Sequence, residues 1–215
     1  PRVPLWGYRD ESRPEVMMQK IAAAKRHGVD AFIFDWYWYD GQPFLEQCLD
    51  NGFLGAKNND RMKFYLMWAN HDWKNLHPGT RCTGSYPFDF LWTTRFETVP
   101  FVWDYLIENF FTQENYYRVD GKPYFSIYEL SKFVAIFGSV EGAKQALEQF
   151  RQDCVAAGLP GVHLNAIVWG KPIVPGEETP SDPGDLAREL GCSSSAVSHW
   201  IAGRSAPSAT VFRTI

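Results

Sequence analysis

The stretch from Ala31 to Gly41, AFIFDWYWYDG, constrains the fold more than any other part of the chain. It opens as an apolar, aromatic run that is typical of a strand buried in a sheet. It closes with four consecutive aromatic residues between Asp35 and Asp40, followed by a glycine turn. Aromatic faces beside carboxylates suit a sugar, because its C–H faces stack on the rings and its hydroxyls bond to the acids. The same residues also suit a purely structural role, in which the aromatics cap the core.

Helix and strand patterns alternate along the chain. An amphipathic helix is predicted through residues 16–27, with Ser12 as a candidate cap, Pro14 in its first turn and Gly28 at its end. It leads directly into the strand that begins at Ala31. Further strands are predicted at 63–69, 124–128 and 162–169, with a possible fifth at 196–201, and helices at 44–49, 93–112 (interrupted near Pro100), 139–157 and 184–190.

Conspicuous aromatic and polar residues follow these strands rather than precede them. They are Trp38, Tyr39, Asp40, Asn70, His71, Asp72, Trp73, Tyr128, Glu129, Trp169 and, less clearly, Trp200. Strands separated by helices favour a parallel α/β sheet, and a (β/α)8 barrel over an open one, with these residues at its C-terminal face. About five strands are counted, so we expect an incomplete barrel that lacks its first and last strands. The whole chain, residues 1–215, is predicted to be one partial barrel domain.

Composition excludes several other classes of function. The net charge is −4, so no basic field indicates a nucleic-acid partner, and no apolar run is long enough to span a bilayer. The four cysteines are far apart and show no zinc or redox spacing. Aromatic residues make up 16% of the chain, which favours an aromatic-lined cleft but is equally compatible with a tryptophan-rich core.

Four acids at predicted strand ends are candidates for acid–base chemistry: Asp35, Asp40, Asp72 and Glu129. Glu129 directly follows a buried strand, so partial desolvation can raise its pKa toward use as a general acid; the alternative is a solvated carboxylate at a strand exit. Asp72 is either a ligand for a sugar hydroxyl or a loop cap, and Asp40 before Gly41 suits a turn.

Polar side chains beside these acids have similar pairs of interpretations. His71 is either a proton shuttle or hydroxyl ligand, or a structural loop residue. Asn70 can donate and accept at once, which suits a pair of sugar hydroxyls. Trp73 is interpreted as a platform for a sugar ring, whereas Trp169 is either a platform or part of the core.

Four segments carry a resemblance to a known family: EVMMQKIAAAKRHGVDAFIFDWYWYDG (15–41), KFYLMWANHDW (63–73), YYRVDGKPYFSIYEL (116–130) and, more weakly, ELGCSSSAVSHWI (189–201). Together they resemble the glycoside hydrolase family 99-like proteins, the group that holds endo-α-mannosidases and the WbsX-type proteins of polysaccharide gene clusters. The resemblance implies a (β/α)8 barrel with a cleft for α-mannoside-like or related glycans, and no metal or other cofactor.

The resemblance also implies where glycan contacts lie. The aromatic strand end of the family falls on Tyr37, Trp38 and Tyr39. Its Trp-Ala-Asn-x-x-Trp pattern falls on Trp68, Ala69, Asn70 and Trp73, and its tyrosine after Gly-Lys-Pro falls on Tyr128. Two departures stand out. Relatives often carry Glu where this chain has His71, and the family's Asn-Glu-Trp-x-Glu-Gly type motif, which holds its presumed catalytic carboxylates, is absent from this sequence.

The segment LARELGCSSSAVSHWIAGRSAPS (186–208) has a competing interpretation as a helix-turn-helix of phage-repressor type. Residues 172–183 contain too many prolines for the supporting helix that such a motif needs, and there is little basic charge for phosphate contacts. A helix through residues 194–201, where a strand is expected, would favour this interpretation.

The first functional hypothesis is therefore a glycoside hydrolase-like enzyme that acts on α-linked, mannoside-like oligo- or polysaccharides. Glu129 is its catalytic candidate within a chain from which the main acid pair is missing. The alternatives are a non-catalytic glycan-binding homologue and a glycosyltransferase of a polysaccharide cluster, although no Gly-rich phosphate loop supports the latter.

Overall fold

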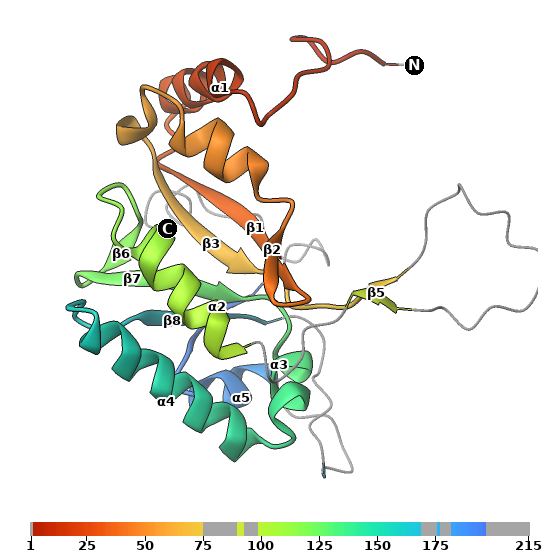
Figure 1. Ribbon diagram of the computed structural model, residues 1–215, viewed down its shortest axis with the longest axis vertical. Coiled ribbons are helices and arrows are strands. Elements are labelled where there is room, and N and C mark those ends of the chain that lie inside the picture. The colour runs from red at the N-terminus through yellow and green to blue at the C-terminus, as the bar shows by residue number, and fades with distance from the viewer. Residues whose placement is uncertain (1, 75–89, 93–98, 169–175, 177–181, 197–215) are drawn as a thin grey trace, which may run out of the picture.

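The computed structural model describes residues 2–74, 90–92, 99–168, 176 and 182–196. Five strands within these ranges run parallel in one sheet (Figure 1): β1 (Ala31–Tyr39), β3 (Lys63–Trp68), β7 (Lys122–Ile127), β8 (His163–Val168) and β9 (Ser193–Ala196). The order in the sheet is β2-β1-β3-β7-β8-β9, in which β2 (Gln42–Phe44) is antiparallel to β1, and β6 (Arg118–Val119) forms a hairpin with β7.

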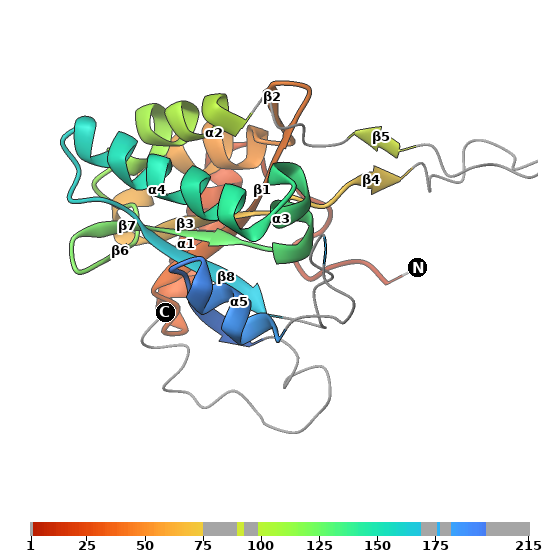
Figure 2. The ribbon, with the colours of Figure 1, turned by 90° about the horizontal axis from the view of Figure 1, so that it is seen from below.

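Helical segments connect the parallel strands. They are α1 (Pro14–Arg26), the π-helical η1 (Cys48–Leu54), the 3₁₀ turn η2 (Asn59–Arg61), α2 (Val99–Leu106) with its π-helical continuation η4 (Ile107–Phe111), α3 (Leu130–Phe137), α4 (Val140–Ala156) and α5 (Pro183–Glu189). A separate antiparallel pair, β4 (Trp73–Lys74) and β5 (Phe90–Trp92), projects from the body of the protein in both views (Figures 1 and 2).

Local sequence signals explain how the helices begin and end. Pro14 occupies the first turn of α1, and Gly28, with φ of 80°, adopts the left-handed conformation that follows its end. Ser12 is not the cap of α1, because its backbone N–H and its hydroxyl both bond to Asp10 instead. At α4 the N-cap is Ser139, whose hydroxyl accepts a hydrogen bond from the backbone N–H of Gly142.

The predicted order of elements agrees with the structure for α1, β1, β3, β7, α4, β8 and α5. The helix expected at 44–49 is misplaced. Residues 42–44 form β2, and the helical segment η1 begins only at Cys48 and ends at Leu54. The sequence reasoning missed α3. The last strand lies at 193–196, and residues 93–98, 169 and 197–201 lie outside the described residues.

The sheet has two chemically different faces. Positions that match across the sheet, Trp36, Trp68, Ile127 and Ala166, are at most 2% exposed and point toward the helices. On this helix face Trp68 meets Trp103 of α2 (ring centroids 5.7 Å apart). Phe125 likewise meets Phe150 of α4, at 5.9 Å. The alternate positions form a second face, called here the polar face, which includes Asp35, Tyr37, Ser126, Tyr128 and Asn165.

A mixed α/β fold with a parallel sheet is thereby confirmed. Among the described residues the sheet ends at β2 and β1 on one side and at β9 on the other. Closure into a (β/α)8 barrel, the incompleteness of that barrel and the single partial domain stay predictions. Residues 193–196 pair with β8 as a strand, where a helix-turn-helix would need a helix, and this speaks against the DNA-binding interpretation of the segment.

Candidate functional site

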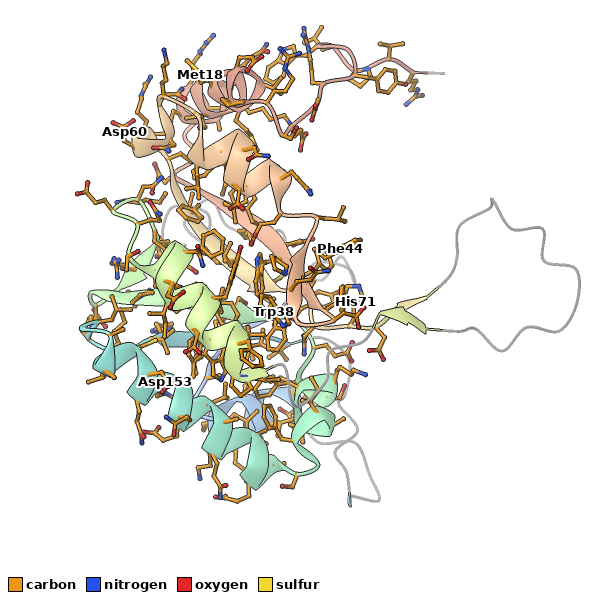
Figure 3. All side chains as sticks on the ribbon, in the orientation of Figure 1. Met18, Trp38, Phe44, Asp60, His71 and Asp153 are labelled. Carbon is orange, nitrogen blue, oxygen red and sulfur yellow. The ribbon has the colours of Figure 1, made fainter. Side chains whose placement is uncertain are left out.

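The carboxyl ends of β1, β3 and β7 meet at one edge of the sheet. Trp36 is paired with Trp68, and Trp68 is paired with Ile127, so the next residues, Tyr37 and Tyr128, stand level with each other on the polar face. Figure 3 shows Trp38, Phe44 and His71 together at this end of the sheet, with Met18 and Asp60 at the other.

A histidine fills the space between the two tyrosines. The β3 position level with them is Ala69, whose small side chain leaves room above the strand, and His71 follows two residues later. The imidazole ring contacts Tyr37 edge-to-face with centroids 6.0 Å apart, and Tyr128 in the same manner at 5.8 Å. Together with Asp35, these residues form what is called here the polar-face cluster: Asp35, Tyr37, His71 and Tyr128.

The charges of the cluster influence one another. Burial raises the pKa of Asp35, and the nearby His71 opposes that rise. Burial also raises the pKa of Tyr37, with further contributions from the negative charge of Asp35 and from Tyr128. The side chain of Asp35 is nevertheless partly exposed, so a solvent-borne ligand can reach it. Asp35 is thus a carboxylate in contact with both solvent and the cluster.

Backbone contacts fix the loop that carries His71. The buried Asn70 amide donates to the carbonyl of Glu129 (2.9 Å) and accepts from its N–H (2.8 Å), which ties the end of β3 to the start of α3. The Tyr39 hydroxyl donates to the carbonyl of His71 at 2.7 Å. Asn70 therefore has a structural task that sequence reasoning did not foresee, and Tyr39 is almost fully buried while it holds the loop.

The two acids that follow β3 and β7 are engaged by neighbours. One carboxylate oxygen of Asp72 forms an ion pair with Lys132 of α3 at 2.6 Å. The carboxylate of Glu129 accepts from the Ser131 hydroxyl at 2.8 Å. Among the residues that the structure describes, the Asp35 carboxylate is engaged in no hydrogen bond or ion pair.

The remaining predicted contacts divide between the core and the undescribed parts of the chain. Trp38 and Trp68 point to the helix face and are 3% and 0% exposed, and Trp38 packs against Tyr105 of α2 at 5.3 Å. The backbone of Trp73 pairs with Trp92 in the projecting hairpin, but its side chain lies outside the described atoms, as does all of Trp169.

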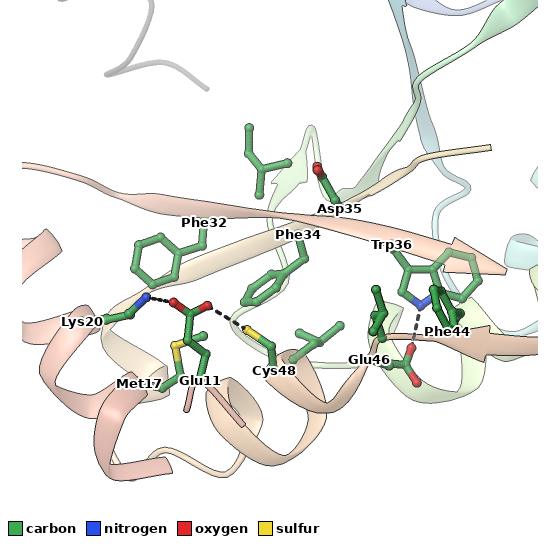
Figure 4. A pocket seen from close by; sticks show the side chains of 13 residues that line it. Glu11, Met17, Lys20, Phe32, Phe34, Asp35, Trp36, Phe44, Glu46 and Cys48 are labelled. Atoms are coloured by element: carbon green, nitrogen blue, oxygen red, sulfur yellow. Dashed lines mark hydrogen bonds and ion pairs between the residues drawn. The ribbon is translucent and has the colours of Figure 1, made fainter. Parts of the chain in front are cut away.

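A cavity of about 470 Å³ lies beside β1 rather than at the strand ends (Figure 4). Its floor is built from Phe32, Phe34 and neighbouring apolar residues of α1 and η1, while Asp35 points to the opposite side of β1. Its charged groups are already paired: Lys20 with Glu11, and Glu46 with the indole N–H of Trp36 at 2.5 Å. This cavity therefore offers a ligand fewer free polar groups than the polar-face cluster does.

The described residues contain neither a cluster of metal-ligand type nor a helix of membrane-spanning type. None of their His, Cys, Asp and Glu side chains gather in a group of three that could hold a metal ion. Within the same ranges, no helix has the length and apolarity that crossing a bilayer requires.

A family model described as Glycosyltransferase WbsX matches residues 1–183, which is most of the chain. The chain belongs to the WbsX family. This confirms the family that the sequence motifs indicated, and those motifs include the residues of the polar-face cluster.

Individual relatives are more distant. The chain is 34% identical over 80 residues to the uncharacterized protein WxcX of two strains of Xanthomonas campestris pv. campestris, B100 and ATCC 33913. That segment covers 37% of this chain and 11% of WxcX, so the chain spans about a tenth of the length of these relatives.

Similar solved structures include a glycoside hydrolase-like protein, with a TM-score of 0.48 and 15% identity over 77% of this chain and 46% of the other. A GH99 endo-α-mannosidase from Bacteroides thetaiotaomicron has a TM-score of 0.36 and 15% identity over 92% and 70%. At these scores the structural likenesses support no conclusion about function, which has to come from the family and from the side chains.

Proposed function

We propose that the protein is a carbohydrate-active enzyme that binds α-linked, mannoside-like glycans at the polar-face cluster. The observation that carries the proposal is the grouping of Tyr37, His71 and Tyr128 at the carboxyl ends of three parallel strands, with Asp35 beside them. Aromatic faces next to a carboxylate and an imidazole offer both stacking and hydrogen bonding to a sugar. The carboxyl ends of parallel strands are also where α/β enzymes bind their substrates.

The binding part of this proposal is tested by calorimetry of the whole gene product with α-mannan oligosaccharides. We expect Tyr128→Ala to weaken binding by about tenfold, since a lost aromatic contact is worth roughly 1 kcal/mol or more. The matched control is Tyr8→Ala, because Tyr8 is 77% exposed in the N-terminal segment. Equal affinities of the wild type and Tyr128→Ala would place the glycan elsewhere.

Two reactions are compatible with such a site. Glycoside hydrolysis is the first, and it needs two carboxyl groups on either side of the scissile bond. Glycosyl transfer to a sugar hydroxyl is the second. It is favoured by the family description. It is also favoured by the contacts of Asp72 with Lys132 and of Glu129 with Ser131, which leave Asp35 as the acid of the polar-face cluster that makes no hydrogen bond or ion pair among the described residues.

Product analysis separates these reactions. Release of the aryl group from aryl α-mannosides, or shortening of α-mannans, supports the hydrolase. Extension of an acceptor glycan that depends on an added mannosyl phosphate donor supports the transferase. Glycan binding with neither reaction would leave a binding protein, and would remove the enzyme from the proposal.

A further inference from the structure

We propose that Asp35 is the general base of the polar-face cluster, and that His71 is a positioning residue that stabilises the carboxylate of Asp35. The proposal rests on the function proposed above and names the group that accepts the proton from the attacking hydroxyl. The sequence indicates Asp35 only as one of four acid–base candidates, and the family match does not single it out.

The first argument is the position of Asp35. It lies two residues before Tyr37 on the same face of β1, about 7 Å away at the rise of a strand. A sugar that rests against Tyr37 and Tyr128 therefore has its ring hydroxyls or its anomeric carbon within reach of this carboxylate. Neighbouring Trp36 points to the helix face, so the backbone of β1 itself directs Asp35 toward the ligand side.

The second argument is availability. A base must be able to take up a proton, and the lone pairs of Asp72 and Glu129 are already occupied in part by Lys132 and Ser131. Within the described ranges no neighbour occupies the carboxylate of Asp35, which is also open to solvent.

The third argument is the set of side chains around Asp35. His71 from the β3 loop lies beside Asp35, with Tyr37 from β1 and Tyr128 from β7 on either side of the imidazole. The ion pair of Asp72 with Lys132 lies just beyond in the same loop. Partial burial raises the pKa of Asp35, which makes it a stronger base than a solvated aspartate, and His71 opposes that rise.

The step balances without a further reagent. The O–H bond of the attacking hydroxyl, from water or from an acceptor sugar, breaks, and its proton moves to a carboxylate oxygen of Asp35. The oxygen forms a bond to the anomeric carbon as the bond from that carbon to the departing oxygen breaks. The electron pair leaves on the departing oxygen, which remains as an anion if it belongs to a phosphate and takes a proton from solvent if it belongs to a sugar.

The test compares Asp35→Asn with Asp120→Asn in the whole gene product. Asp120 is an exposed residue in the turn between β6 and β7, and its φ of 50° is a conformation that asparagine tolerates. With an aryl α-mannoside or a mannosyl phosphate donor, we expect Asp35→Asn to lower kcat at least 100-fold with KM changed less than threefold. Asp120→Asn should stay within twofold of the wild type. A loss of less than fivefold in Asp35→Asn would overturn the proposal.

A second measurement does not depend on turnover. The carboxyl carbon of Asp35 is followed by NMR as a function of pH in the wild type and in His71→Asn. Because His71 opposes the rise in the pKa of Asp35, its removal should move the titration midpoint of Asp35 to higher pH, and the acid limb of kcat/KM should move with it. An unchanged midpoint would remove the role of His71.

The two proposals fail in different ways. Absence of glycan binding by the wild type would overturn the proposed function. Normal binding together with turnover that survives in Asp35→Asn would overturn only the role of Asp35. Binding without any turnover would overturn both the enzyme part of the proposed function and the role of Asp35.

Discussion

Trp36 and Tyr37 are neighbours in the chain, yet they belong to two different regions of the molecule, the helix face and the polar face of the sheet. Trp36 points to the helix face, is 2% exposed and donates to the buried Glu46. Tyr37 points to the polar face, is half-buried and contacts His71. The difference teaches that an aromatic cluster at a strand end is not one feature, because the pleat of the strand places alternate residues in the helix-covered core and on the polar face.

Among substitutions that compare the stability of the two faces, the largest effect is expected for Trp68→Ala on the helix face. Trp68 is fully buried against Trp103 and Phe133, so its loss should lower the free energy of unfolding by about 3–5 kcal/mol in a denaturant titration. Tyr128→Ala on the polar face should cost only about 1 kcal/mol, because that ring is half-buried. Similar losses for both variants would abolish the distinction between the faces.

Asn70→Ala is expected to have the next largest effect. It removes both hydrogen bonds to the backbone of Glu129 and should lower the free energy of unfolding by about 1–3 kcal/mol, measured in the same way. Asn109→Ala is the control, since its amide bonds to the Tyr105 carbonyl on an exposed surface. If both substitutions cost the same, the link between β3 and α3 does not stabilise the fold.

Glu46 should make the helix face sensitive to pH. Burial raises its pKa to about 6, against hydrogen bonds from Tyr105 and Trp36 that lower it. Because the pKa of Glu46 in the folded protein lies above its ordinary value of 4.5, the stability contributed by its protonated form is fully present below pH 4.5. It is lost as pH rises through about 6. The loss amounts to about 2 kcal/mol.

Thermal unfolding between pH 4 and 8 checks this expectation. Glu46→Gln should lack this component of the pH dependence, whereas Glu114→Gln, at an exposed position, should keep it. Parallel curves for the wild type and Glu46→Gln would show that the buried carboxylate does not titrate in this range.

The smallest effect is expected for Ile33→Thr on the polar face. Ile33 is 54% exposed although it lies in the middle of β1, so replacing it with another β-branched residue should change the free energy of unfolding by less than about 0.5 kcal/mol. A cost above 2 kcal/mol would show that this face is covered in the folded protein.

Much of the fold could be predicted because its signals are local. The apolar runs of β1, β3, β7 and β8, and the cap of α4 at Ser139, can be recognised from a few neighbouring residues. The segment after β2 could not, because η1 contains Asn51 and Gly52, which predict a loop, whereas Phe53 packs against Phe34 of β1 and Phe64 of β3.

The candidate site was predicted in outline and missed in detail. The rule that polar residues gather after parallel strands predicted His71 and Tyr128 at one edge of the sheet, and the family resemblance added Tyr37; the three rings are in contact in the structure. It could not separate them from Trp38 and Trp68, which are equally conspicuous but fall on the other side of the pleat. Counting alternate residues along β1 would have placed Asp35 on the same face as Tyr37. The hydrogen bonding of Asn70 to Glu129 could not be predicted in this way, because these residues are 59 positions apart in the chain.

The small side chain of Ala69 has a consequence for any attempt to redesign this protein. Ala69 lies level with the two tyrosine rings that flank the imidazole, so a bulkier residue there is expected to push the imidazole outward even if every tyrosine is retained. Residues 69 and 71 should accordingly be varied as a pair in mutant libraries, because a change in the size of one resets what the other can do.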